Sequence, residues 1–72
     1  MSDFQSIAMR RRLAKVERSL ADDHDAAATS AVNNPDKAIF HHRAAESCRA
    51  RADAYEHRAD REEAQYAQDS CR

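Results

Sequence analysis

The sequence contains no glycine and no tryptophan, and it has a single proline, Pro35. A chain without glycine cannot form the glycine-rich loops that cradle phosphates, nor the nucleophile elbow of the α/β-hydrolases. β-Branched residues are also scarce, which argues against a β-sheet. These absences exclude the common nucleotide-binding and sheet-based hydrolase folds.

Large apolar residues are few for a chain of 72 residues. They are Met1, Phe4, Ile7, Met9, Leu13, Val16, Leu20, Val32, Ile39, Phe40, Tyr55 and Tyr66. No run approaches the roughly 20 apolar residues that a membrane-spanning helix needs. No apolar stretch near the N-terminus has the form of a signal peptide. We therefore expect a cytoplasmic protein that does not contact membranes.

Alanine and charged residues are abundant instead. The chain has 16 alanines, with 12 Lys and Arg residues against 13 Asp and Glu residues, for a net charge of −1. This composition favours helices. Asn34 is a good N-cap, Pro35 suits the first helical position, and Asp36 complements the helix dipole. Ser2 and Gln5 have the spacing of a capping box at the other end.

These signals predict one all-α domain spanning residues 1–72. We expect one helix over about residues 3–32, a turn at 33–34 and a second helix over about residues 35–69. Because the connection is so short, the two helices should lie antiparallel as a helical hairpin. Two helices that fold only with a partner are the alternative.

The second predicted helix carries a heptad repeat. Alanine recurs every seven residues at Ala38, Ala45, Ala52 and Ala59, with a companion series at His41, Cys48, Tyr55 and Glu62. This spacing is typical of a coiled-coil seam, and its alanines permit close approach of two helices. Folding about the turn pairs residues whose numbers sum to about 68. We expect an alanine-type core of Met9, Leu13, Val16, Leu20, Ala45, Cys48, Ala52, Tyr55 and Ala59.

Several apolar residues lie off this predicted seam. Phe4 and Ile7 fall on the far side of the first helix, while Ile39 and Phe40 point away from the alanine series. A lone hairpin of this size rarely buries enough apolar area to be stable. We therefore expect a homodimer that forms a four-helix bundle, with Phe4 and Ile7 at the dimer interface.

Charged side chains are sorted along the second helix. One flank of the alanine series is acidic, and the face opposite that series carries arginines. The acidic members are Glu46, Asp53, Glu56, Asp60 and Glu63. An arginine face attracts nucleic acid, whereas an acidic flank could occupy the basic surface of a DNA-binding protein. The near-neutral net charge makes nucleic acid the less favoured partner.

The cysteines and histidines do not form a recognisable active site. Cys48 and Cys71 would lie about 35 Å apart on one helix, too far for a disulfide within one chain. Two free thiols fit a reducing compartment. The four histidines, of which the register sets His24 near residues 40–44, are expected to be structural or on the surface. We expect no catalytic residue, cofactor or metal, and hence no enzyme; whether His24, His41 or His42 binds metal stays open, as does a crosslink through Cys71.

Three segments resemble one family of small phage proteins. They are AMRRRLAKVERSLA at residues 8–21, NNPDKAIFHHRAAES at residues 33–47, and the alanine-spaced helix that follows. The family is the anti-quorum-sensing proteins that temperate transposable phages encode early. The resemblance implies a dimeric helical hairpin in the bacterial host's cytoplasm. It further implies inhibition of a LuxR-type quorum-sensing transcription regulator, which is kept off DNA, with the type IV pilus assembly ATPase as a second target.

The residues themselves favour protein binding over catalysis. Apolar side chains left off the predicted seam, together with sorted charges, suit an inhibitor or adaptor. We expect the partner surface to include Ile39, Phe40 and Arg43, because interfaces concentrate binding energy in aromatic and arginine residues. A dimeric hairpin that binds RNA or DNA through an arginine face is the alternative function.

Overall fold

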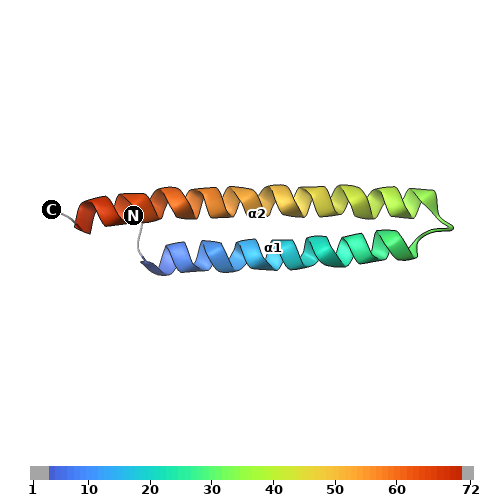
Figure 1. Ribbon diagram of the computed structural model, residues 1–72, viewed down its shortest axis with the longest axis horizontal. Helices are drawn as coiled ribbons and strands as arrows, with labels where there is room; N and C mark the ends of the chain where they lie inside the picture. The colour runs from blue at the N-terminus through green and yellow to red at the C-terminus, as the bar shows by residue number, and fades with distance from the viewer. Residues whose placement is uncertain (1–3, 71–72) are drawn as a thin grey trace.

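Two long helices run side by side in opposite directions. The computed structural model describes residues 4–70, and within them it shows α1 (Phe4–Ser30) and α2 (Pro35–Ser70) and no strand. The helices form a thin rod of 60 × 14 × 13 Å, with the turn at one end and the start of α1 and the end of α2 toward the other (Figure 1). The all-helical prediction is confirmed. Over the described residues, neither helix is long and apolar enough to cross a membrane.

The turn is built as the Asn34-Pro35 motif predicted. The Lys37 amide donates to Oδ1 of Asn34 at 3.2 Å, and the Ala38 amide donates to the Asn34 carbonyl at 3.0 Å. Asn34 is thus the N-cap of α2, and Asp36 lies in the first turn. The Asn34 amide in turn donates to the Ala31 carbonyl at 3.0 Å, which closes the connection.

The helix bounds differ slightly from those expected. The first helix ends at Ser30 rather than at about residue 32, because the residues after it form the turn. The second helix ends at Ser70, one residue beyond the expected end. The expected start at residue 3 and the capping contribution of Ser2 lie outside the described residues.

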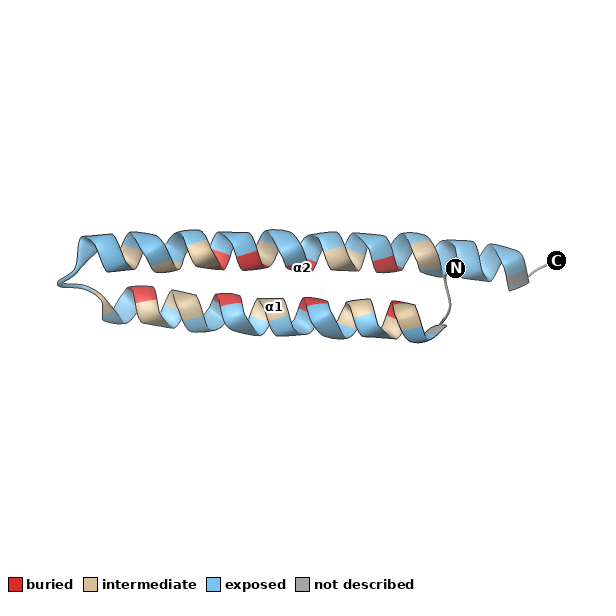
Figure 2. Ribbon diagram, turned by 180° about the vertical axis from the view of Figure 1, so that it is seen from behind, coloured by how far each residue is buried: buried red, intermediate tan, exposed pale blue. Residues whose placement is uncertain are grey.

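The core is a seam of small side chains between the helices. Figure 2 shows the buried positions of α1 and α2 facing each other, with exposed positions on the outer sides. The buried residues recur every seven positions on α1 and at heptad spacing on α2. They are Ile7, Ala14, Ala21, Ala28, Ala45, Cys48, Ala52 and Ala59.

The α2 half of the predicted seam is confirmed, and the α1 half is wrong. Ala45, Cys48, Ala52 and Ala59 are buried and Tyr55 is half-buried. On α1, however, the expected core residues are exposed: Met9, Leu13, Val16 and Leu20.

The register of the hairpin was nevertheless close to that expected. Ala21 packs against Ala45 and Cys48, and His24 lies opposite His41. Only the rotation of α1 about its own axis differs. Alanine opposite alanine lets the two backbones approach closely, whereas leucine and valine at the same positions would hold them apart.

Candidate protein-binding surface

The two flanks of the hairpin have different chemistry. We call the first the charged flank: it carries residues four positions after each buried residue of α1, namely Arg11, Arg18 and Asp25. These lie about 40° to one side of the seam, whereas residues one position before a buried residue lie about 100° to the other side. Leu13 and Leu20 are on that second side. The seam therefore separates a polar surface from an apolar one.

A ladder of ion pairs crosses the charged flank. Arg18 contacts Glu56 at 2.7 Å and Asp53 at 2.9 Å. Arg11 pairs with Glu63, and also with Asp60 at 3.1 Å. The polarity is reversed nearer the turn, where Arg49 of α2 pairs with two aspartates of α1, Asp22 and Asp25. The ladder joins the two helices along most of their length.

These pairs shift the titration of the groups involved. The hydrogen bond from Arg18 holds the pKa of the Glu56 carboxyl below its usual value, although partial burial opposes this. Arg49 does the same for the pKa of Asp25, again mainly through a hydrogen bond. Much of the acidic flank predicted on α2 thus contacts α1 within the same chain. A partner that used this flank would compete with the hairpin's own ion pairs.

The other flank of α1 presents exposed apolar side chains, which we call the apolar stripe: Met9, Leu13, Val16 and Leu20. Their exposed fractions are 60%, 38%, 51% and 43%. They follow one another at spacings of four, three and four residues, so they form one continuous line on the helix. This is the spacing of a helix–helix interface, yet within the hairpin the line faces solvent.

Basic groups border the apolar stripe. Arg12 is exposed on its outer side, at a height between Met9 and Val16 along the helix. On the inner side Arg51 of α2 bonds to Glu17 at 3.2 Å and also donates to Sγ of Cys48 at 3.3 Å. The stripe is therefore bordered by an exposed arginine on one side and by an arginine–glutamate ion pair on the other.

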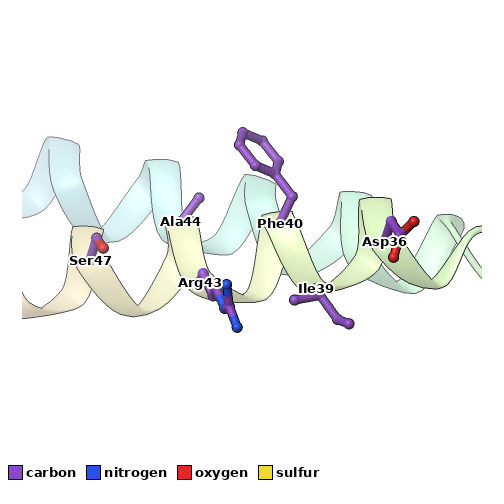
Figure 3. Close-up of a pocket in the computed structure, with 6 residues that line it drawn as sticks. All are labelled: Asp36, Ile39, Phe40, Arg43, Ala44 and Ser47. Carbon is purple, nitrogen blue, oxygen red and sulfur yellow. The ribbon is translucent and has the colours of Figure 1, made fainter.

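The residues predicted to bind a partner lie on the outer side of α2, near the turn. Phe40 is 63% exposed, and Ile39 and Arg43 are exposed as well. Figure 3 shows Phe40 and Ala44 pointing to one side of α2 while Ile39 and Arg43 point to the other. The shallow hollow among them is lined by side chains of this one helix. The surface is therefore a ridge with an aromatic knob rather than a ligand pocket.

The two residues predicted for the dimer interface have different positions. Ile7 is 5% exposed and packs in the hairpin seam, so it is not available to a second chain while the hairpin is closed. That prediction is wrong, because Ile7 belongs to the same heptad series as Ala14 and Ala21. Phe4 begins α1, and its side chain lies outside the described residues.

The histidines and cysteines divide between seam and surface. His24 and His41 meet in the seam, with their Nδ1 atoms 2.9 Å apart, while His42 and His57 are exposed. Cys48 is a buried free thiol, and Cys71 lies outside the described residues. Within the described part of the chain, no three His, Cys, Asp or Glu side chains come together as metal ligands.

Sequence reasoning missed both the apolar stripe and the ion-pair ladder. The signal for the ladder is present in the sequence. Arg11, Arg18 and Asp25 recur every seven residues, and so do the oppositely charged residues that they contact, Glu63, Glu56 and Arg49.

The chain matches no protein-family model, and neither a curated protein nor a solved structure shows significant similarity to it.

Proposed function

We propose that this protein acts by binding other proteins, and that it works as a dimeric inhibitor. The observation that carries the proposal is the apolar stripe. A hairpin whose core is built mainly from alanine leaves four of its large apolar side chains in line on one exposed flank. Contact between apolar side chains and water is unfavourable, so a continuous exposed apolar line marks a surface that binds another one.

A second copy of the chain is the occupant that the stripe fits best. Fully burying one such side chain stabilises by about 1.5–3 kcal/mol, and about half of that is still available at these exposures. One stripe therefore offers about 4 kcal/mol, close to the lower limit of the association cost. Two stripes facing each other offer about 8 kcal/mol, and subtracting the lower limit of the association cost leaves about 4 kcal/mol, which corresponds to a dissociation constant of about 1 mM.

The stripe is also self-complementary. When two α1 helices pack antiparallel about a two-fold axis between Ala14 and Lys15, Met9 faces Leu20 of the second copy and Leu13 faces its Val16. The product is a four-helix bundle with the two α1 helices at its centre.

The dimer leaves the outer side of α2 free for a different partner. We place that contact at Ile39, Phe40 and Arg43, beside the turn. The resemblance to phage anti-quorum-sensing proteins suggests its class: a LuxR-type transcription regulator that is kept off DNA, with the type IV pilus assembly ATPase as a second target. An RNA- or DNA-binding function is less favoured, because Arg11, Arg18 and other arginines are already ion-paired within the hairpin.

Light scattering tests the dimer. As the chain concentration is raised through about 1 mM, the mass of the wild-type protein should rise toward twice the chain mass, and its melting should depend on concentration. Val16→Lys should be monomeric but still helical by circular dichroism, because Val16 lies outside the seam. Ala26→Lys, at an exposed position of the same helix beyond the end of the apolar stripe, is the matched control and should remain dimeric. A wild-type monomer at every concentration would exclude this arrangement.

A DNA mobility-shift assay with a purified LuxR-type regulator tests the inhibition. The wild-type protein should release the regulator from DNA. Phe40→Ala should weaken inhibition by about 30-fold if Phe40 is a hot spot of about 2 kcal/mol. Tyr66→Ala, exposed at the other end of α2, is the control. Unchanged DNA occupancy with wild-type protein would exclude this class of partner, and a direct shift of DNA without the regulator would favour the nucleic-acid alternative.

A further inference from the structure

Two histidines face each other across the seam, close to the turn. His24 of α1 and His41 of α2 are both half-buried, and their Nδ1 atoms lie 2.9 Å apart. The ring centroids are 5.2 Å apart with an interplanar angle of 35°. Because both atoms are Nδ1, one ring must donate its proton and the other must accept it with a lone pair.

This pair differs from other polar contacts between the helices. Arg10 pairs with Glu62, and Glu17 pairs with Arg51, so each of those contacts joins opposite charges. His24 and His41 are instead two like groups, and neither brings a charge that satisfies the other. Each offers the ring nitrogen that divalent transition metals prefer as a ligand.

We propose that His24 and His41 form a two-histidine site for a divalent transition metal such as Zn²⁺, Ni²⁺ or Cu²⁺, which bridges α1 and α2. The metal takes the place of the shared proton between the two Nδ1 atoms. The ring that donates changes tautomer, its proton moving from Nδ1 to Nε2, so that both Nδ1 lone pairs bind the metal. Water completes the coordination, as at an open metal site.

The two rings now meet head-on, because the 2.9 Å between the Nδ1 atoms plus about 1.1 Å from each atom to its ring centroid nearly equals the 5.2 Å between the centroids. With metal–nitrogen bonds of about 2.0–2.1 Å, cis ligands at about 90° place their nitrogens about 2.9 Å apart, and tetrahedral ligands about 3.4 Å apart. On a tetrahedral metal the two ring centroids would be about 5.2 Å apart, given that each nitrogen is about 1.1 Å from its centroid. The rings therefore need to turn, but the helices need not separate.

Asp25, next to His24, is already paired with Arg49, so the charges beside the histidine pair balance each other. The pair is nevertheless open to solvent. A shallow hollow at the turn, lined partly by Ala31, Lys37 and His41, gives solvent a route to it. Metal entry requires such a route.

Thermal melting of the full chain with NiCl₂ or ZnCl₂ tests the site. Because the metal binds both helices only when they are folded together, the Tm should rise with metal concentration, by several degrees at saturation. MgCl₂ should have no such effect, because magnesium prefers oxygen ligands. His24→Gln and His41→Gln should each abolish the rise, while His57→Gln, an exposed histidine of α2, should retain it.

Nuclear magnetic resonance of the wild-type chain gives a second measurement that does not depend on how the variants fold. Substoichiometric Cu²⁺ should broaden the ring signals of His24 and His41 before those of His42 and His57. Two results would overturn the site: no rise in Tm with millimolar metal, or broadening that reaches His42 and His57 first. A rise that survives in both His24→Gln and His41→Gln would also exclude it.

Discussion

Exchanging Ala21 for leucine distinguishes the two possible seams of α1. Ala21 is fully buried and contacts Ala45 and Cys48, at the point where the two helices are packed by small side chains. Leucine adds three carbon atoms there. Its neighbour Leu20 is 43% exposed and belongs to the apolar stripe. Two adjacent residues thus have opposite roles in the structure.

The expected cost of Ala21→Leu follows from the packing. Overpacking a core costs about 1–3 kcal/mol, and the upper end applies here because the side chains facing Ala21 are already small and cannot yield space. For a domain of this size, about 3 kcal/mol lowers the Tm by about 12–24 °C. Ala26→Leu, at an exposed position of α1, should stay within about 0.5 kcal/mol of the wild type.

The assay is thermal denaturation followed by circular dichroism, at a concentration low enough for the chain to be monomeric. Leu20→Ala should cost about 1 kcal/mol or less there, because Leu20 is only partly covered within one chain. A larger loss of Tm for Leu20→Ala than for Ala21→Leu would refute the alanine seam. It would instead support the seam through Met9, Leu13, Val16 and Leu20.

Three further predictions concern the turn and the charged flank. Asn34→Ala should cost about 1 kcal/mol, or about 4–8 °C in Tm, because it removes the N-cap of α2; an unchanged Tm would contradict that role. Arg18→Gln should lower the Tm in dilute buffer, and this loss should shrink in 1 M NaCl, where exposed ion pairs are screened; a loss that is independent of salt would point to packing instead. The pKa values of Asp25 and Glu56 are depressed in the folded state, so their contribution to stability is present above the unfolded carboxyl pKa of about 4 and is lost as pH falls through the folded values. Denaturation titrations between pH 7 and pH 2 should show this loss, and it should be smaller in Arg49→Gln.

Local signals predicted the turn and α2 well. The Asn34-Pro35 motif acts through contacts within a few residues, so its outcome depends little on the rest of the fold. The alanine repeat of α2 also has one apolar series at heptad spacing, which left little ambiguity about the face that packs. The start of α2 and its buried residues therefore follow directly from sequence.

The rotation of α1 could not be predicted by apolarity alone. α1 carries two apolar faces at heptad spacing. One contains Ile7 and Ala21, and the other contains Met9 and Leu13. Ranking residues by size selects the second series, since larger side chains release more free energy on burial. The fold uses the first, because close alanine packing also brings Arg11 and Arg18 within reach of carboxylates on α2. Treating the charges together with the apolar pattern would have favoured the correct face.

The same consideration explains why the surface was assigned in reverse. The sequence pattern predicts Ile7 at an outer interface and the larger residues of the apolar stripe in the seam. The structure exchanges the two roles. A single hairpin buries the small residues of α1 and leaves these larger ones exposed.

The alanine repeat has a consequence for how the hairpin finds its alignment. A series of equal small side chains packs almost as well after one helix slides by a full heptad, so shape complementarity alone is degenerate. The ladder pairs Arg11 with Glu63, Arg18 with Glu56 and Asp25 with Arg49, at steps of seven residues. A slide in one direction would oppose Asp25 to Glu56, and a slide in the other would oppose Arg18 to Arg49. Like charges thus penalise both slipped alignments, so the charge order along the chain encodes an alignment that the alanines cannot.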